Sequence, residues 1–141
     1  MAEALFKSEF QIEAGNFVTA GEASASIKRQ LRQLGVDAAV VRNVAIAAYE
    51  CELNMVIHST GGRMSVEVLA DGVICIHARD SGPGIQDIQA AMKEGFSTAT
   101  EEVWMMGFGA GMGLPNMRRC SDELHIESSP EGTEIEMKFY I

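Results

Sequence analysis

The chain has 141 residues, of which 47% are hydrophobic and 22% are charged, and its 20 acidic and 11 basic residues give a formal net charge of −9 at pH 7. A chain of this length can bury one core, so we expect a single domain over residues 1–141, without room for a sensor domain or a dimerisation stalk. The acidic balance argues against nonspecific nucleic-acid binding, which requires a basic surface, but it allows an anionic nucleotide held by backbone amides and a metal ion.

Neither a membrane segment nor a secretion signal is expected. The longest apolar stretches are far shorter than the roughly 20 residues that a membrane helix needs. The N-terminal sequence MAEALFKSEF has no basic segment followed by an apolar one. The three cysteines are widely spaced and form no CxxC pair, which favours reduced thiols in a cytoplasmic protein.

The first part of the chain predicts a strand followed by two helices. Residues 4–12 alternate in the manner of a strand. A helical period then runs from 17 to 34 and ends at Gly35, with a predicted apolar face of Ile27, Leu31 and Leu34. Asp37 is a suitable N-cap for a second helix over 38–59, whose predicted core residues are Val40, Val41, Val44, Ile46 and Ala47.

The rest of the chain predicts two hairpins separated by helices and a glycine-rich segment. Strands at 63–70 and 73–79 flank Asp71-Gly72, which is a strong hairpin signal. The following predicted segments are a short helix near 87–93, an irregular stretch at 95–113, a helix at 114–121, and strands at 123–128 and 133–140 around the turn Pro130-Glu131-Gly132. This order of elements predicts a two-layer α/β sandwich with the helices on one face of the sheet.

The second predicted helix carries a polar stripe formed by Glu50, Asn54 and His58. Steps of four residues keep these side chains on one side of a helix that is otherwise apolar. One interpretation is a solvent-facing edge. The other is a carboxylate and an amide oxygen offered to a metal-bound ligand, because a hard cation such as Mg²⁺ takes oxygen ligands and obtains several of them from phosphates and water.

Two glycine-containing motifs follow the stripe. Asp80-Ser81-Gly82-Pro83-Gly84-Ile85 comes directly after a predicted strand, where it is either a simple turn or an aspartate that accepts a hydrogen bond from an amino group. Gly107, Gly109, Gly111 and Gly113 alternate at the entry to a helix, an arrangement suited to phosphate binding. This second motif is neither a Walker loop nor a GxGxxG fingerprint.

In this order and spacing, the three motifs resemble the N, G1 and G2 boxes of the GHKL ATPase superfamily, which has the Bergerat ATP-binding fold. Gly132-Thr133 fits the superfamily's late Gly-Thr element, so the resemblance covers about residues 38–140. The stretches ARDSGPGIQDIQAAMKEGFST and GMGLPNMRRCSDELHIESSPEGT are similar to the anti-sigma-factor serine/threonine kinases of bacterial partner-switching systems. A departure is the segment EEVWMM at 101–106, which is longer than the stressosome type would have.

The resemblance implies both a fold and a set of site residues. The fold is a two-layer α/β sandwich with a mixed, mostly antiparallel sheet. Asn54 would bind the Mg²⁺ that bridges the ATP phosphates, Glu50 would orient or deprotonate the acceptor hydroxyl, and Asp80 with Thr133 would contact the adenine amino group. The other implied nucleotide contacts are Gly82, Gly84, Ile85, Gly107, Gly109, Gly111, Met112, Gly113 and Leu114, several of them in an ATP lid at about 95–113. His58 either contacts a phosphate or packs at the end of the helix. Arg118 and Arg119 either contact a phosphate or a partner carboxylate, or they belong to a solvated helix face.

The implied activity is that of an ATP- and Mg-dependent serine/threonine kinase that phosphorylates a STAS-type antagonist protein. The alternative is an ATP-binding anti-sigma factor that sequesters a sigma factor or another regulator with little turnover. The resemblance also allows a homodimer, and no nucleic-acid or membrane partner is expected. The catalytic domain of a sensor histidine kinase is disfavoured, because the chain has no room for a phosphoacceptor helix pair.

Overall fold

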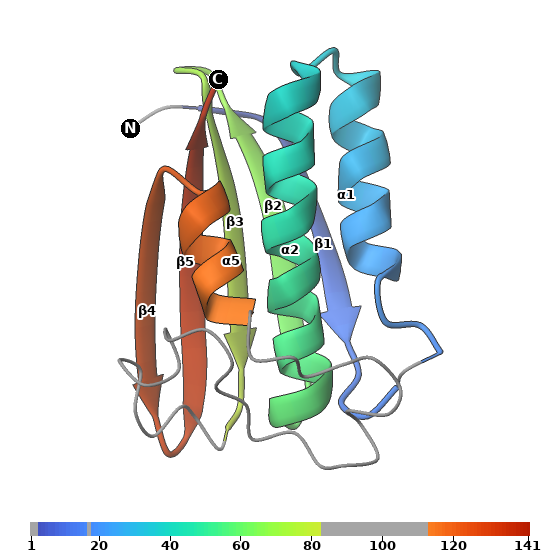
Figure 1. Cartoon of the computed structure of the whole chain (residues 1–141), viewed down its shortest axis with the longest axis vertical. Helices are drawn as coiled ribbons and strands as arrows, with labels where there is room; N and C mark the ends of the chain where they lie inside the picture. The colour runs from blue at the N-terminus through green and yellow to red at the C-terminus, as the bar shows by residue number, and fades with distance from the viewer. Residues whose placement is uncertain (1–2, 17, 83–112) are drawn as a thin grey trace.

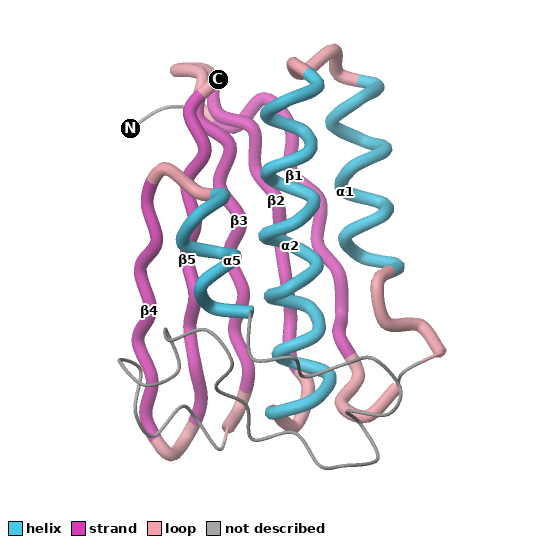
Figure 2. Tube along the Cα trace, viewed as in Figure 1, coloured by secondary structure: helices cyan, strands magenta, loops and turns pink. Residues whose placement is uncertain are grey.

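The computed structural model describes residues 3–16, 18–82 and 113–141. Within these residues, five strands form one sheet in the order β1-β2-β3-β5-β4, and helices lie on one face of it (Figures 1 and 2). The elements are β1 (Ala4–Ile12), α1 (Glu22–Gln33), α2 (Ala38–His58), β2 (Gly62–Leu69), β3 (Val73–Asp80), α5 (Gly113–Cys120), β4 (Glu123–Ser129) and β5 (Gly132–Tyr140). The predicted two-layer α/β sandwich is confirmed.

Every neighbouring pair of described strands is antiparallel, so the prediction of a mixed sheet was wrong for this part of the chain. The β2–β3 and β4–β5 pairs are hairpins, which are antiparallel by construction. Between β1 and β2 the chain passes along α1 and back along α2 (Figure 1). The chain reverses direction three times on this path, between β1 and α1, between α1 and α2, and between α2 and β2, and β2 therefore runs antiparallel to β1.

The core lies between the helices and the inner face of the sheet. Alternate residues of the central strands are buried, as the two-residue period of a strand requires. They pack against the apolar sides of α1 and α2; the largest fully buried side chains are Phe139, Ile27, Leu31, Met55, Met64, Ile74, Ile76, Met117, Met137, Val41, Val44 and Val66. The other face of the sheet carries no described helix, and its side chains are mainly polar. No described helix is long and apolar enough to cross a membrane.

One residue of a predicted apolar helix face and one predicted core residue are instead exposed. Leu34 is 51% exposed because α1 ends at Gln33 and Leu34 is already the C-cap, where the chain turns toward α2. Ile46 is 40% exposed, while Val44 and Ala47 are fully buried, because Ile46 lies on the side of α2 that faces away from the sheet. Helix α1 also begins at Glu22 and not at residue 17.

The C-terminal part of α2 packs over the end of β3. A Cβ placed on Gly62 would lie 2.8 Å from both the Met55 Cε on α2 and the Asp80 Cα on β3. Glycine at position 62 therefore lets the helix and two strands approach closely. As a result, the end of α2, the end of β3 and the start of β5 meet at one end of the sandwich (Figure 1).

Candidate functional site

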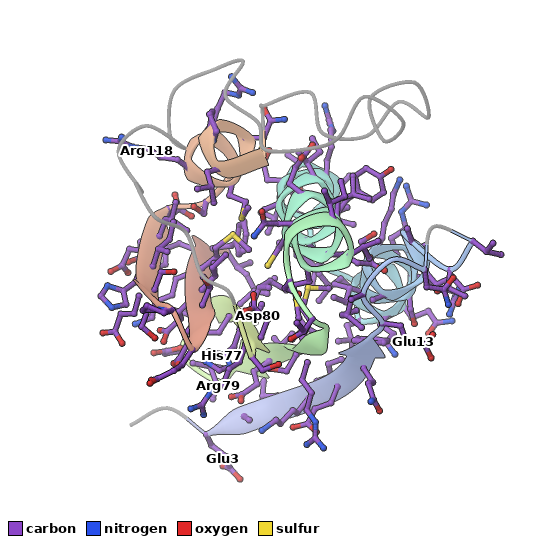
Figure 3. All side chains as sticks on the ribbon, turned by 90° about the horizontal axis from the view of Figure 1, so that it is seen from below. Glu3, Glu13, His77, Arg79, Asp80 and Arg118 are labelled. Carbon is purple, nitrogen blue, oxygen red and sulfur yellow. The ribbon has the colours of Figure 1, made fainter. Side chains whose placement is uncertain are left out.

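The Asp80 carboxylate is fixed at the end of β3 by two backbone amides. Its Oδ1 accepts hydrogen bonds from the Gly82 N–H at 3.0 Å and from the Thr133 N–H at 3.1 Å. In the described part of the chain, both hydrogen bonds to this carboxylate go to Oδ1, which leaves Oδ2 as an acceptor for a ligand. Figure 3 shows Asp80 between the sheet and the helices, whereas His77 and Arg79 lie on the open side of the sheet.

Thr133 links Asp80 to the last hairpin. Its side chain is buried, and its Oγ1 lies 2.8 Å from the Ser128 Oγ on β4. Asp80, Thr133 and Ser128 line an open hollow of about 530 Å³ at the end of the sheet, together with Arg79, Ser81, Glu127, Ser129, Glu131, Gly132 and Glu134. Asp80 and Thr133, which are both predicted to contact the adenine amino group, are joined by the hydrogen bond from the Thr133 backbone N–H to the Asp80 carboxylate.

Gly82 has a structural reason to be glycine that does not involve a ligand. Its φ of 126° is a conformation that side chains rarely adopt. A Cβ at this position would also lie 3.2 Å from the Pro130 carbonyl oxygen in the β4–β5 turn. The glycine thus allows the segment after β3 to pack beneath that turn, next to the candidate site.

Glu50 lies where α2 meets the start of α5. The Asn116 Nδ2 donates to the Glu50 Oε1 at 3.2 Å, and a Cβ on Gly113 would lie 3.5 Å from the Glu50 Oε2. Leu114 and Met117 are buried and hold α5 against the core. Leu114, which was predicted to contact the nucleotide, therefore has its side chain in the hydrophobic core.

The remaining members of the polar stripe follow Glu50 along α2. Asn54 is half-buried one turn further on, and its side chain makes no hydrogen bond with the described residues. His58 is the last residue of α2, and its side chain is outside the part that the structure describes. Also outside the described residues are the predicted helix at 87–93, nearly all of the predicted lid, and the predicted contacts Gly84, Ile85, Gly107, Gly109, Gly111 and Met112.

Sequence reasoning missed Glu52, a buried carboxylate beside the stripe. It is only 2% exposed, and it accepts hydrogen bonds from the N–H groups of Gly21 (3.0 Å), Ala23 (3.2 Å) and Ser24 (3.0 Å). These amides belong to the first turn of α1, where the N-cap Gly21 has no side chain to cap the helix. A signal for this role was the charged residue at a core-facing position of an apolar helix.

Cys51 lies between Glu50 and Glu52 in sequence but takes no part in the site chemistry. It is completely buried, and burial raises the pKa of its thiol to about 12, with the charges of Asp80 and Glu52 adding to the increase. The thiol is therefore protonated at neutral pH and serves as an apolar core group.

The chain belongs to the histidine kinase-like ATPase domain family, whose model matches residues 17–139. It is 34% identical over 109 residues to the serine/threonine-protein kinase RsbT of Bacillus subtilis strain 168. This match covers 74% of this chain and 76% of that protein. It is 33% identical over 106 residues to the anti-sigma F factor of Caldanaerobacter subterraneus, with 72% of this chain and 71% of that protein covered.

A solved structure shares the fold. The RsbU and RsbW domains of Rv1364c from Mycobacterium tuberculosis match 96% of this chain with a TM-score of 0.67 and 16% identity. The match covers 32% of that structure, so the chain spans about a third of its length. The predicted family and the GHKL-type α/β fold are confirmed by these comparisons.

Proposed function

We propose that this protein is a serine/threonine kinase that transfers the γ-phosphate of ATP to a STAS-type antagonist protein. The observation that carries the proposal is a carboxylate, Glu50, held by Asn116 of α5 on the same helix, α2, whose C-terminal part packs over the end of β3 where Asp80 and Thr133 are bonded. Similarity to the kinase RsbT supports the same activity. Phosphoryl transfer depends mainly on positioning and on charge stabilisation, and a fixed carboxylate beside a nucleotide site suits this chemistry.

Each site residue has a distinct role in this proposal. Asp80 accepts a hydrogen bond from the adenine amino group through Oδ2, since Oδ1 is already bonded to two amides. Glu50 orients the acceptor hydroxyl and takes up its proton as the bond to phosphorus forms. The start of α5 at Gly113 directs backbone amides toward the phosphates, as helix N-termini do at anion sites.

Asn54 is the residue that we propose as a ligand for Mg²⁺. An amide oxygen is a suitable donor for this hard cation, and the Asn54 side chain has no competing hydrogen bond within the described residues. When bound, Mg²⁺ would neutralise charge on the ATP phosphates. His58 is a further candidate for phosphate contact because it follows Asn54 by one turn of α2.

Incubation with labelled ATP and purified STAS-domain proteins tests the proposal. We expect labelled phosphoserine or phosphothreonine on a STAS protein with the wild-type chain. Glu50→Gln should retain ATP affinity, because the predicted role of Glu50 is in the transfer step, while the rate of transfer falls at least tenfold. Transfer by Glu50→Gln at the wild-type rate would contradict the assignment of Glu50.

The alternative function, an ATP-binding anti-sigma factor with little turnover, is favoured by the similarity to anti-sigma F factors. In that case the chain binds a sigma factor or another regulator, and ATP serves as a conformational ligand. Binding of a sigma factor that depends on ATP, combined with negligible labelling of every STAS protein tested, would favour this alternative over the kinase.

A further inference from the structure

Asn116 connects the candidate catalytic carboxylate to a cationic side chain on the same helix. On one side, its Nδ2 donates to the Glu50 Oε1 at 3.2 Å. On the other side, its Oδ1 accepts a hydrogen bond from the Arg119 guanidinium. The resulting chain, Arg119 to Asn116 to Glu50, joins α5 to α2 directly at the candidate site.

The chemistry of the two partners fixes which way the Asn116 amide faces. A guanidinium can only donate hydrogen bonds, so it must meet the amide oxygen. An ionised carboxylate can only accept them, so it must meet the amide nitrogen. Arg119 and Glu50 thus impose the same orientation on Asn116, and the amide presents a donor to one defined oxygen of Glu50.

The hydrogen bond from Asn116 is not required to attach α5 to the rest of the protein. Leu114 and Met117 are 6% and 0% exposed, and they anchor the helix in the core. Asn116 is half-buried between these anchors and the α2 surface. Its amide therefore acts on a helix that apolar packing already holds in place, and its effect falls on the Glu50 side chain.

A glutamate on a helix surface has several rotatable bonds, and an unrestrained carboxylate would sample many positions. With Oε1 held by Asn116, the carboxylate is restricted to a few rotamers, and Oε2 lies beside the start of α5 at Gly113. Positioning of this kind matters for transfer, because a misplacement of about 1 Å can cost on the order of 100-fold in rate.

We propose that Asn116 is a positioning residue for phosphoryl transfer, which holds Glu50 Oε1 so that Oε2 faces the acceptor hydroxyl, and that Arg119 orients the Asn116 amide for this role. The inference rests on the proposed kinase function. It adds to that function a residue of α5 with no assigned role in the sequence motifs.

Asn116→Asp is the most informative variant, because it keeps the size of the side chain and the acceptor for Arg119 but replaces the donor that faces Glu50 with a carboxylate oxygen. We expect the rate of phosphoryl transfer to the STAS acceptor to fall by about 10- to 100-fold. The same fall is expected for ATP hydrolysis, in which water is the acceptor, when ADP release is measured. The calorimetric Kd for Mg-ATP should stay within about twofold of wild type, since Asn116 acts on transfer. Asn43→Asp is the matched control, because Asn43 is exposed on α2 seven residues before Glu50 and should leave transfer unchanged.

A double-mutant cycle separates positioning from a general structural effect. In the Glu50→Gln background, Asn116→Asp should cause no further loss, because the carboxylate that Asn116 positions is already gone. Additive losses would overturn the inference, as would a wild-type rate for Asn116→Asp alone. If Glu50→Gln itself transfers normally, or if the wild-type chain transfers nothing, the proposed function fails and the inference fails with it. If the wild-type chain transfers phosphate and Glu50→Gln transfers it slowly, but Asn116→Asp transfers it at the wild-type rate, the inference alone fails.

Discussion

At the scale of single residues, the two oxygens of Asp80 have different tasks. Oδ1 joins the end of β3 to the start of β5 through the Thr133 amide and also accepts from the Gly82 amide, while Oδ2 is directed to a ligand in our proposal. Asp80→Asn should therefore preserve the fold, since an asparagine oxygen can accept the same two hydrogen bonds. Its NH₂ group would then face the adenine amino group, where two donors oppose each other. We expect calorimetric ATP affinity to fall by about 1–3 kcal/mol, which is roughly 5- to 150-fold in Kd.

Asp71→Asn is the matched control for Asp80→Asn. Asp71 is exposed in the β2–β3 turn at the opposite end of the strands, so the same loss of charge should leave ATP affinity unchanged. Equal affinities for wild type and Asp80→Asn, in samples that unfold at the same temperature, would remove Asp80 from the nucleotide site.

At the scale of elements, helix α1 depends on a cap supplied by another helix. Three amides of the Gly21–Ser24 turn donate to the buried Glu52 carboxylate of α2. Glu52→Ala would leave these amides without partners in a buried position. We expect the free energy of unfolding to fall by about 2–3 kcal/mol, measured by urea denaturation.

Glu22→Ala tests whether this loss is specific to the cap. Glu22 is exposed in the first turn of α1, where its removal costs only about 0.5 kcal/mol through the helix dipole. If both variants lose the same small amount of stability, water must replace Glu52 as the partner of the α1 amides, and the capping role would be wrong.

The contact between Glu52 and the start of α1 shows why some elements can be predicted from sequence and others cannot. The strand at 4–12 and the hairpin at Asp71-Gly72 were predicted closely, because alternation and turn residues are local signals. The start of α1 was placed five residues too early, because its cap lies about thirty residues later in the chain. A distant partner of this kind leaves no periodic signal.

The candidate site also contains residues that the sequence indicates and one that only the structure reveals. Glu50, Asn54 and Asp80 stood out because a polar residue in an apolar helix, or an aspartate at a strand end, is visible in a short window of sequence. Asn116 could not be found in this way, since it meets Glu50 across 66 residues of chain. Only the packing of α5 against α2 reveals that the two side chains touch.

At the scale of the whole molecule, acidic residues outnumber basic ones, and many lie on the open face of the sheet. On this face, strands β4 and β5 carry Glu123, Glu127, Glu134 and Glu136. Among these carboxylates, Glu134 has a histidine partner: the His77 Nε2 lies 2.9 Å from the Glu134 Oε1, and the hydrogen bond between them lowers the pKa of that carboxyl. Because the pKa of this carboxyl is lower in the folded than in the unfolded state, its ionisation stabilises the fold at pH values above the unfolded-state pKa. This stabilisation is lost as the pH falls through the folded-state pKa.

The net charge of −9 predicts that salt stabilises the protein at neutral pH. Repulsion among the excess carboxylates disfavours the compact state, and raising NaCl from 0.01 to 0.2 M shortens the screening length from about 30 Å to less than 10 Å. Relief of about 1 kcal/mol of repulsion would raise Tm by roughly 3–6 °C in a domain of this size, measured by calorimetry or circular dichroism. Near pH 5, close to the isoelectric point of about 4.7, the same salt step should change Tm much less. A Tm that falls with salt at pH 7 would mean that attractive pairs such as Lys7–Glu67, 3.4 Å apart, outweigh the repulsion.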